Sequence, residues 1–253
     1  MDIKQREDLI IGRNPVLEAL RAGRTIDSVL VASGEKKGTI VQILGKCRER
    51  GIVVKEVASS KLDFMCVNQN HQGVVAVCAM SEYAEIEEIF GRAAQRGEDL
   101  FVLICDEIED PHNLGALIRT AEVVGAHGVI IPKRRSASLT FSTAKASAGA
   151  VEYIPVCKVS SLVQAIDALK AKGVWVHGAD MNGRIWHNAD LKGPVAIVIG
   201  SEGKGLGALV KKKCDGILSL PVRGQINSLN ASVAGGVLMY EVARQRMEAD
   251  IKG

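Results

Sequence analysis

The residues best suited to chemistry lie in three polar segments, and each follows or includes the end of a short apolar run. In the first, D-E-I-E-D-P-H-N-L-G-A-L-I-R (106–119), Asn113 stands near the start of an expected helix and Arg119 stands among apolar neighbours. Helix capping alone explains one asparagine. A guanidinium in apolar surroundings usually has an anion or a carboxylate as its partner. The segment therefore indicates an anion-binding position at Arg119.

The second polar segment, V-A-I-V-I-G-S-E-G-K-G-L-G (195–207), turns from an apolar strand into a glycine-rich loop. Glycines let the backbone approach a ligand closely, and we expect Glu202 to project into the same space. The run Gly203-x-Gly205-x-x-Ala208 nearly matches the dinucleotide-binding fingerprint, so an NAD-binding oxidoreductase is one alternative. Against it, Arg223 stands about 20 residues further on, where that fingerprint needs an acidic residue.

The third polar segment, L-P-V-R-G-Q-I-N-S-L-N-A-S-V-A (220–234), places Asn227, Ser228, Asn230 and Ser232 just before an apolar helix. A helix cap needs only one or two such residues. Asparagine and serine also offer neutral donors and acceptors that suit ribose hydroxyls and phosphate oxygens. The segment therefore favours a nucleotide or RNA ligand.

Strands that alternate with helices must position these segments. Over residues 99–253 we predict strands at 100–105, 128–131, 153–156, 174–179, 195–199 and 216–220, with helices between most of them. Their lack of polar alternation indicates a parallel sheet covered by helices on both faces, and such sheets bind ligands beyond the carboxyl ends of their strands.

The chain before residue 99 divides into two further parts. Residues 1–80 read as a small α/β domain, in which Asn14 is the expected N-cap of the first helix and Pro15 its first residue. Residues 81–98 are charge-rich, and we expect them to form a helical linker. The predicted organisation is thus two α/β domains, 1–80 and 99–253, joined by residues 81–98.

Composition excludes several classes of protein. With 47% apolar and 24% charged residues the chain is not disordered, and no apolar run approaches the roughly 18–20 residues of a membrane span. The polar start has no secretory pattern. Six cysteines without C-x-x-C spacing indicate reduced thiols of a cytoplasmic protein. The scattered histidines predict no metal site.

Taken together, the three polar segments resemble the three sequence motifs of the SpoU family of RNA ribose 2′-O-methyltransferases, within the SPOUT class. The matching stretches are D-P-H-N-L-G-A-L-I-R-T-A-E (110–122), I-V-I-G-S-E-G-K-G-L (197–206) and L-P-V-R-G-Q-I-N-S-L-N-A-S-V-A (220–234). Nearer the start, G-R-N-P-V-L-E-A-L (12–20) and N-H-Q-G-V-V-A (70–76) look like the family's substrate-binding domain, which is similar to the ribosomal protein L30e fold. The stretch I-P-K-R-R-S-A-S-L-T (131–140) is typical of the RlmB branch.

The resemblance implies a SPOUT domain with a deep C-terminal trefoil knot, S-adenosylmethionine as methyl donor and a homodimer. Carried over by position, the donor pocket would be lined by Gly200, Leu220, Leu229 and Ala179. The catalytic cluster would comprise Arg119, Asn113, Glu202, Ser228 and Asn230, with Glu202 orienting Arg119. Substrate-binding positions would be Arg13, Asn14, Arg134 and Arg135.

The activity implied by the resemblance is methyl transfer to a ribose 2′-hydroxyl of RNA, with a guanosine of bacterial 23S rRNA as the expected target. The alternatives are a tRNA or antibiotic-resistance rRNA 2′-O-methyltransferase, or a non-catalytic RNA-binding or ribosome-assembly module. A binding module would have no need of Arg119, Glu202 and Asn230 together, which favours the enzyme.

Overall fold

The computed structural model describes residues 8–34, 36–67, 69–79, 81–226 and 228–252, with side chains through residue 247. The chain divides into two compact units. Unit 1 holds the described residues up to Glu82 together with Ser138–Phe141, and unit 2 holds the remainder.

Unit 1 is a mixed α/β unit built on a four-stranded sheet of order β1-β4-β2-β3. Its elements are β1 (Leu9–Ile11), α1 (Arg13–Arg21), β2 (Ile26–Ala32), α2 (Thr39–Glu49), β3 (Val53–Val57), α3 (Ser59–Cys66) and β4 (Val74–Cys78). β2 and β3 are parallel, whereas β4 pairs antiparallel with both β1 and β2. The sheet buries apolar side chains on both faces, against α1 and α2 on one side and α3 on the other.

The first helix begins one residue before the expected cap. Gly12 is the N-cap of α1, with φ of 97°, and Asn14 is the second helical residue. A positive φ favours glycine, and the peptide N–H of Gly12 donates to the carbonyl of Val74. The backbone pairing of β1 with β4 therefore carries the chain into the helix, and the prediction of Asn14 as the cap is wrong.

Residues 81–98, which we expected to be a linker, mostly form the helix α4 (Ile86–Arg96). Glu85 and Glu88 form a reciprocal capping box at its start. Ile89 is fully buried and Ala93 nearly so, both in the apolar core of unit 2. The charges that suggested a linker lie on the helix surface, and α4 is a packed part of unit 2.

Unit 2 is a six-stranded sheet of order β10-β8-β9-β5-β6-β7, and every pairing between its neighbouring strands is parallel. Its strands are β5 (Phe101–Cys105), β6 (Gly128–Pro132), β7 (Val156–Val159), β8 (Trp175–Ile185), β9 (Val195–Ile199) and β10 (Gly216–Ser219). Its helices after α4 are α5 (Pro111–Val123), α6 (Phe141–Ala146), η1 (Ala150–Glu152), α7 (Leu162–Ala171), η2 (Trp186–Asn188), α8 (Ala208–Lys213) and α9 (Ala231–Lys252). The predicted parallel sheet is confirmed, but the strand expected at 153–156 lies at Val156–Val159, after the short helix η1.

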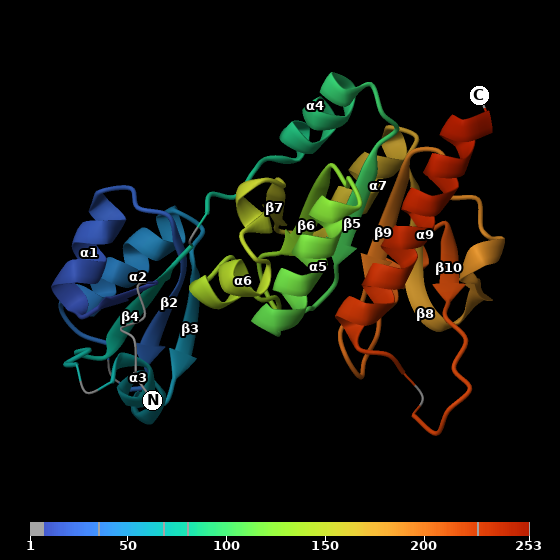
Figure 1. Ribbon diagram of the computed structural model, residues 1–253. Helices are drawn as coiled ribbons and strands as arrows, with labels where there is room; N and C mark the ends of the chain where they lie inside the picture. Colours follow the sequence, from blue (N-terminus) through green and yellow to red (C-terminus); the bar gives the residue numbers. More distant parts are fainter. Residues whose placement is uncertain (1–7, 35, 68, 80, 227, 253) are drawn as a thin grey trace. The chain divides into compact units, whose positions relative to one another are not determined.

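Helices cover both faces of this sheet (Figure 1). Val102, Ile104 and their neighbours on adjacent strands face α4, α7 and α8. On the opposite face α5 packs beside α9, and Gly235 of α9 lies so close to Leu117 of α5 that a Cβ there would stand 2.4 Å from it. Successive side chains of a strand point to opposite faces of the sheet. Strands that are apolar throughout therefore provide apolar side chains to the helices on both faces.

The strand β8 runs beyond the predicted end at residue 179 and reaches Ile185. Its pairing with β10 shifts register between Ile217 and Leu218. A Cβ on Gly183 would stand 2.6 Å from the carbonyl of Ile217, so only glycine allows this close approach. The extension brings residues 180–185 past the carboxyl edge of the sheet.

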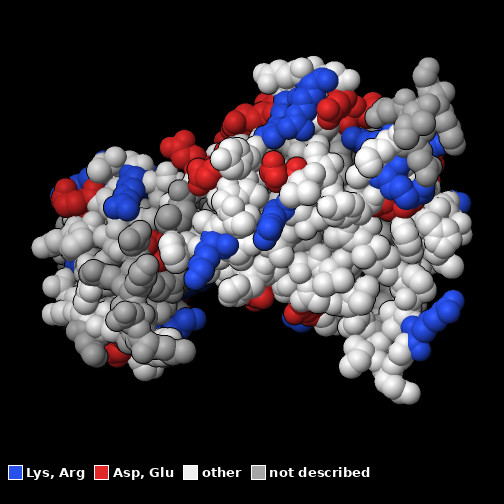
Figure 2. Space-filling model, viewed as in Figure 1, with Lys and Arg blue, Asp and Glu red and all other residues white. Residues whose placement is uncertain are grey.

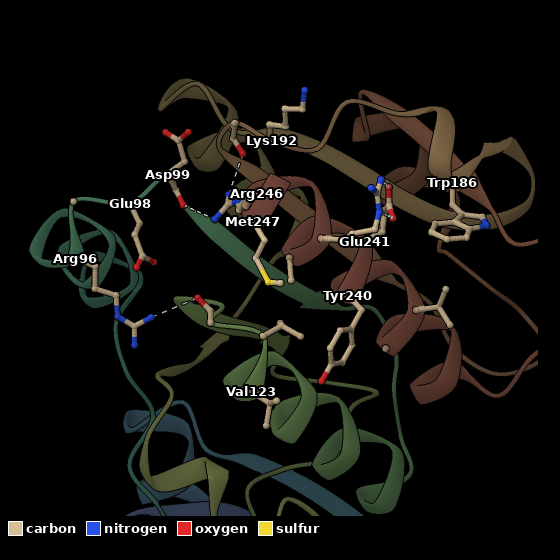
Figure 3. A pocket seen from close by; sticks show the side chains of 18 of the residues that line it. Arg96, Glu98, Asp99, Val123, Trp186, Lys192, Tyr240, Glu241, Arg246 and Met247 are labelled. Atoms are coloured by element: carbon tan, nitrogen blue, oxygen red, sulfur yellow. Dashed lines mark hydrogen bonds and ion pairs between the residues drawn. The ribbon is translucent and has the colours of Figure 1, made fainter. Parts of the chain in front are cut away.

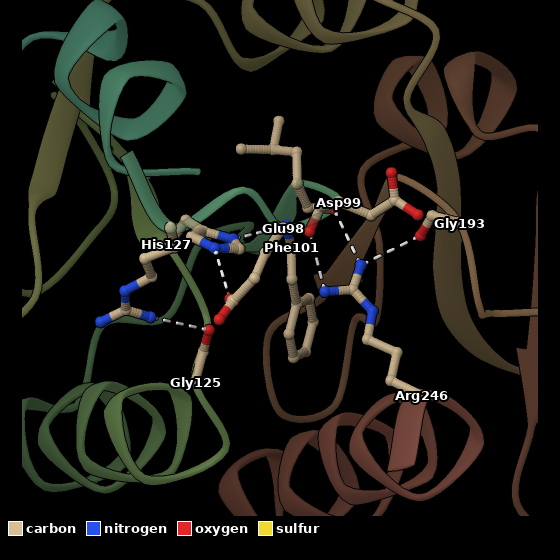
Figure 4. A network of polar contacts seen from close by, with 9 residues as sticks. Glu98, Asp99, Phe101, Gly125, His127, Gly193 and Arg246 are labelled. Carbon is tan, nitrogen blue, oxygen red and sulfur yellow. Dashed lines mark hydrogen bonds and ion pairs between the residues drawn. The ribbon is translucent and has the colours of Figure 1, made fainter. Parts of the chain in front are cut away.

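The long helix α9 is fixed to the sheet by polar groups near its end (Figure 4). The Arg246 guanidinium donates to the carbonyls of Asp99, Leu100 and Gly193 and lies over the ring of Phe101. The preceding residue, the buried Gln245, accepts from the Leu191 N–H and donates to the Ala189 carbonyl. None of the helices in the described part of the chain, α9 included, is long and apolar enough to cross a membrane.

Candidate active site

A cavity of about 630 Å³ opens at the carboxyl edge of the unit 2 sheet. Its wall comes from the middle of β8, from the ends of β9 and β10, from the loops that follow β9 and β10, and from the start of α9. All four predicted donor-pocket residues line it, namely Ala179, Gly200, Leu220 and Leu229. Three members of the predicted cluster line it as well: Glu202, Ser228 and Asn230. The fold therefore gathers segments that lie up to about 50 residues apart in the sequence into one cavity.

The glycine-rich loop after β9 is a tight turn folded back on itself. Ser201 and Gly205 exchange two backbone hydrogen bonds of 3.1 and 2.9 Å. A Cβ on Gly200 would stand 2.3 Å from the Gly205 carbonyl carbon, and Gly203 and Gly205 have φ of 86° and 66°. These glycines are required by backbone contacts and by left-handed conformations, which makes this wall of the cavity a shaped backbone surface.

Three side chains from the three polar segments meet at the mouth of the cavity. Asn113 Nδ2 donates to Glu202 Oε1 at 3.0 Å. Asn230 Nδ2 donates to the same oxygen at 2.6 Å and to Asn113 Oδ1 at 2.9 Å. Each of the three thus contacts the other two, so three of the five residues of the predicted cluster, Asn113, Glu202 and Asn230, form a closed hydrogen-bonded triangle.

Asn230 serves two purposes through the two ends of its amide. Its Oδ1 accepts from the backbone N–H groups of Ser232 and Val233 and from the Ser232 hydroxyl, which caps the start of α9. Its Nδ2 binds Glu202 and Asn113. The capping explanation for this asparagine is therefore confirmed, and its place in the catalytic cluster stays a prediction. Asn227, the first polar residue of the same segment, lies outside the described residues.

A smaller cavity of about 290 Å³ adjoins the first and shares Ser201, Glu202 and Lys204 with it. Asn113 lines this second space together with the loop that precedes α5. Beside it, Glu107 forms an ion pair of 2.9 Å with Arg135. The predicted substrate residues Arg134 and Arg135 are both exposed in the loop after β6, so they stand at the same edge of the sheet as the site.

Arg119 is not brought to the triangle within one chain. It lies six residues after Asn113 on α5, which is about 9 Å along the helix axis, and its side chain is exposed. The described residues that line the cavity do not include it. Glu202 Oε1 accepts hydrogen bonds from Asn113 and Asn230. Among the described residues, no contact joins Glu202 to Arg119, so the expectation that Glu202 orients Arg119 is not supported within one chain.

The remaining predicted residues, Arg13 and Asn14, lie in unit 1 at the start of α1. The Arg13 backbone N–H and Nε–H donate to the side-chain and main-chain oxygens of Gln72. His71 next to it bonds Asp63 of α3 at 2.9 Å. These contacts join the two unit 1 stretches, 12–20 and 70–76, into one surface with Asn14 exposed.

Sequence reasoning missed two charged groups in the cavity wall. Asp180 forms an ion pair of 2.8 Å with Lys211, whose ammonium group holds the pKa of that carboxyl below its ordinary value. Lys204 lies in the glycine-rich loop, two residues after Glu202. Asp180 could have been predicted from its position directly after Ala179, a predicted donor-pocket residue. It was not, because the strand was expected to end at residue 179 and no role was given to the residues that follow.

Comparison with known proteins gives the class to which this fold and site belong. The sequence matches the SpoU rRNA Methylase family over residues 100–240, and the family described as RNA 2'-O ribose methyltransferase substrate binding over residues 9–84. The first match covers more than half of the chain. The chain therefore belongs to the SpoU family of RNA methyltransferases, as the sequence motifs predicted.

Relatives at the sequence level span the whole chain. A Bacillus subtilis protein, YacO, is 48% identical over 96% of this chain and 98% of its own length, and its name assigns it to the TrmH family of tRNA/rRNA methyltransferases without proof of activity. A Staphylococcus aureus protein assigned in the same way is 46% identical over 95% of this chain and 97% of its own length. Both relatives therefore carry both units.

Solved structures share the fold. The SpoU methyltransferase AviRb from Streptomyces viridochromogenes, in complex with AdoMet, has a TM-score of 0.60 at 26% identity and covers 95% of this chain and 90% of its own. An AdoMet-bound rRNA methyltransferase from Sinorhizobium meliloti has a TM-score of 0.59 at 26% identity and covers 93% of this chain and 86% of its own.

Proposed function

We propose that the protein transfers a methyl group from S-adenosylmethionine to a ribose 2′-hydroxyl of RNA, and that its target is a guanosine of bacterial 23S rRNA. The observation that carries the proposal is the triangle of Asn113, Glu202 and Asn230 at the mouth of the cavity. Membership of the SpoU family supports the reaction. The rRNA target rests on the resemblance of residues 131–140 to the RlmB branch.

The cavity fits the proposed donor. Its volume of about 630 Å³ lies within the roughly 300–1,000 Å³ of small-molecule sites. Glycine backbone and the apolar side chains of Leu220 and Leu229 form its walls, and the small side chain of Ala179, within β8, leaves space. We assign donor binding to these residues and to Gly200. Two structural relatives, AviRb and the Sinorhizobium meliloti enzyme, hold AdoMet.

The proposed chemistry needs little more than positioning. The bound sulfonium donor supplies a methyl group already activated by positive charge. Asn113 and Asn230, held by Glu202, form a rigid polar platform beside the donor cavity, and Ser228 adds a hydroxyl to the same wall. Such a platform fixes a ribose in line with the methyl group without reorganising during the reaction.

Arg119 is assigned to the RNA backbone. A guanidinium stays protonated at all ordinary pH values and does not act as a base, but its planar group matches a phosphate. Its side chain is exposed on α5, where an RNA strand can reach it, and it does not line the donor cavity. Arg134 and Arg135 are assigned to the same partner from the loop after β6, and Arg13 and Asn14 from unit 1.

We further propose that the protein acts as a homodimer through the face formed by α5 and α9. Large apolar side chains are exposed there, including Val123 at 61%, Tyr240 at 55% and Met247 at 57%. They line one hollow, into which side chains of both helices project (Figure 3). Over α5 this face is largely uncharged, whereas charged side chains gather over α4 (Figure 2). Charged side chains such as Glu98 and Arg244 line the same hollow. Exposed apolar side chains gathered together in this way are typical of a protein–protein interface.

Calorimetry with S-adenosylmethionine and with NAD tests the donor assignment. Binding of the methyl donor alone supports the proposal, and binding of NAD alone would replace it with the oxidoreductase alternative.

The RNA assignment is tested by the salt dependence of binding, because the affinity of a protein that binds phosphates falls as the salt concentration rises. Methylation of tRNA in place of rRNA would keep the reaction and change the target. The trefoil knot implied by the resemblance stays a prediction.

A further inference from the structure

Asp106 is a buried carboxyl that lies outside the wall of the donor cavity. It directly follows β5 and is 5% exposed, and its Oδ2 accepts a hydrogen bond of 2.7 Å from the backbone N–H of Gly207. A Cβ on Gly207 would stand 3.2 Å from the same oxygen. The glycine-rich loop after β9 therefore packs directly against this carboxyl group at the point where the loop enters α8.

The same loop is held at its other end by the triangle. Glu202, near its start, accepts from Asn113 and Asn230, while Gly207, at its end, donates to Asp106. Between the two ends, Gly203 and Gly205 give the loop conformational freedom that other residues lack. Asp106 and Asn113, which contact the two ends of the loop, both belong to the first polar segment (106–119). One segment therefore holds the loop at both ends.

The geometry points to Asp106 as a positioning residue for donor binding. It holds the loop of residues 201–207 in the shape that closes one wall of the cavity, and it does so without touching the donor. This role rests on the proposed function of the cavity as an S-adenosylmethionine site. It predicts that loss of the carboxyl weakens donor binding while the RNA-binding groups stay in place.

The surroundings of Asp106 give the role a pH signature. Burial raises the pKa of this carboxyl above its ordinary value of 3.8, the Gly207 N–H opposes the shift, and Glu107 and Arg135 act with opposite signs. Cys214 also faces it, and burial raises the pKa of that thiol to about 11, so the thiol is neutral. A neutral carboxylic acid is a weaker acceptor than a carboxylate. Donor affinity should therefore fall as the pH drops through the raised pKa of Asp106.

Fold stability should respond to this group in the opposite direction. A carboxyl whose pKa is raised in the folded state binds its proton more readily there than in the unfolded chain. Its stabilising contribution is full below the unfolded-state pKa and is lost as the pH rises through the folded-state pKa. Acid thus favours the fold through Asp106 while it weakens donor binding, which separates loop positioning from unfolding.

The test is calorimetric titration of S-adenosylmethionine into the full chain and its Asp106 variants between pH 4.5 and 8, within about the range where the folded chain is expected to be stable. Asp106→Ala should weaken donor binding by about tenfold or more, the loss expected for a hydrogen bond to a charged group. Asp106→Asn keeps a neutral acceptor oxygen. It should bind a few-fold more weakly than the wild type, and without the acid loss of affinity that the wild type shows.

Asp215→Ala is the matched control. Its carboxylate also accepts from a backbone N–H, that of Val176 at 2.9 Å, and pairs with Lys170, but it does not line the cavity. This variant should lose stability and keep the donor affinity of the folded protein. The role would be overturned if Asp106→Ala bound the donor as tightly as the wild type. It would also be overturned if Asp106→Asn still lost donor affinity at low pH as the wild type does. A wild-type chain that does not bind the donor would instead overturn the proposed function.

Discussion

Asn230 is the residue at which stability and chemistry can be separated. Asn230→Asp keeps an oxygen that caps α9, and aspartate caps helices about as well as asparagine. It replaces the Nδ2 group, which lies 2.6 Å from Glu202 Oε1, with a second carboxylate oxygen. The two carboxylates repel each other, so the triangle should open.

We expect Asn230→Asp to lower the rate of methyl transfer by about 100-fold, the usual cost of one lost preorganised donor, with little change in melting temperature. Asn230→Ala should lose the same activity and about 1 kcal/mol of stability besides, because it also removes the cap. Methyl-transfer rates and thermal melts of the two variants check both expectations. A fully active Asn230→Asp enzyme would show that the triangle has no part in the reaction.

Arg119 is expected to contact the RNA and not the methyl donor. Its exposed side chain does not line the donor cavity, so Arg119→Ala should abolish methylation while calorimetry finds donor binding nearly intact. Arg119→Lys keeps the charge without the planar group that matches a phosphate, and it should recover only part of the activity. Normal turnover by Arg119→Ala would contradict the assigned contact with RNA.

At the scale of elements, the exposed apolar face of α5 and α9 is the feature with the clearest consequence. Tyr240→Asp places a charge in the middle of the hollow lined by Val123, Val237 and Met247. An unpaired charge in an apolar interface costs several kcal/mol, so sedimentation should show monomers where the wild type is a dimer. Leu209→Asp is the control, because Leu209 is 69% exposed on α8, which packs on the other face of the sheet. Equal masses for wild type and Tyr240→Asp would contradict the interface.

The sequence predicted most of the elements because the strands of unit 2 are short continuous apolar runs. It also predicted that the polar segments meet at one edge of the sheet, because they follow those runs directly; the roles of their residues stay predictions. Three of the features that escaped it have clear physical reasons. The charges of α4 conceal a narrow apolar stripe at Ile89 and Ala93. The end of β8 is set by pairing with β10, which is not a local property. Asp106 was not among the predicted site residues because its contact with the Gly207 N–H joins positions about 100 residues apart in the sequence.

In the whole molecule, we expect the two units to have different roles, donor binding in unit 2 and RNA recognition in unit 1. Unit 2 contains the complete cavity and the triangle, and unit 1 matches a family of RNA substrate-binding domains. Deletion of residues 1–80 should therefore leave a folded, donor-binding dimer that no longer recognises its RNA. Calorimetry with the donor and methylation of rRNA measure the two halves of this expectation. Unimpaired methylation by the shortened chain would show that unit 1 has another purpose.

We propose that the cavity at the carboxyl edge of the unit 2 sheet performs methyl transfer to a ribose of large-subunit rRNA. The most direct measurement is transfer of labelled methyl from S-adenosylmethionine to unmodified bacterial rRNA, followed by mapping of the modified nucleotide. We predict a single 2′-O-methylguanosine in 23S rRNA, and its absence when Asn230→Asp replaces the wild type. Donor binding with no methyl incorporated into rRNA, tRNA or ribosome-assembly particles would contradict the claim and favour a non-catalytic RNA-binding protein.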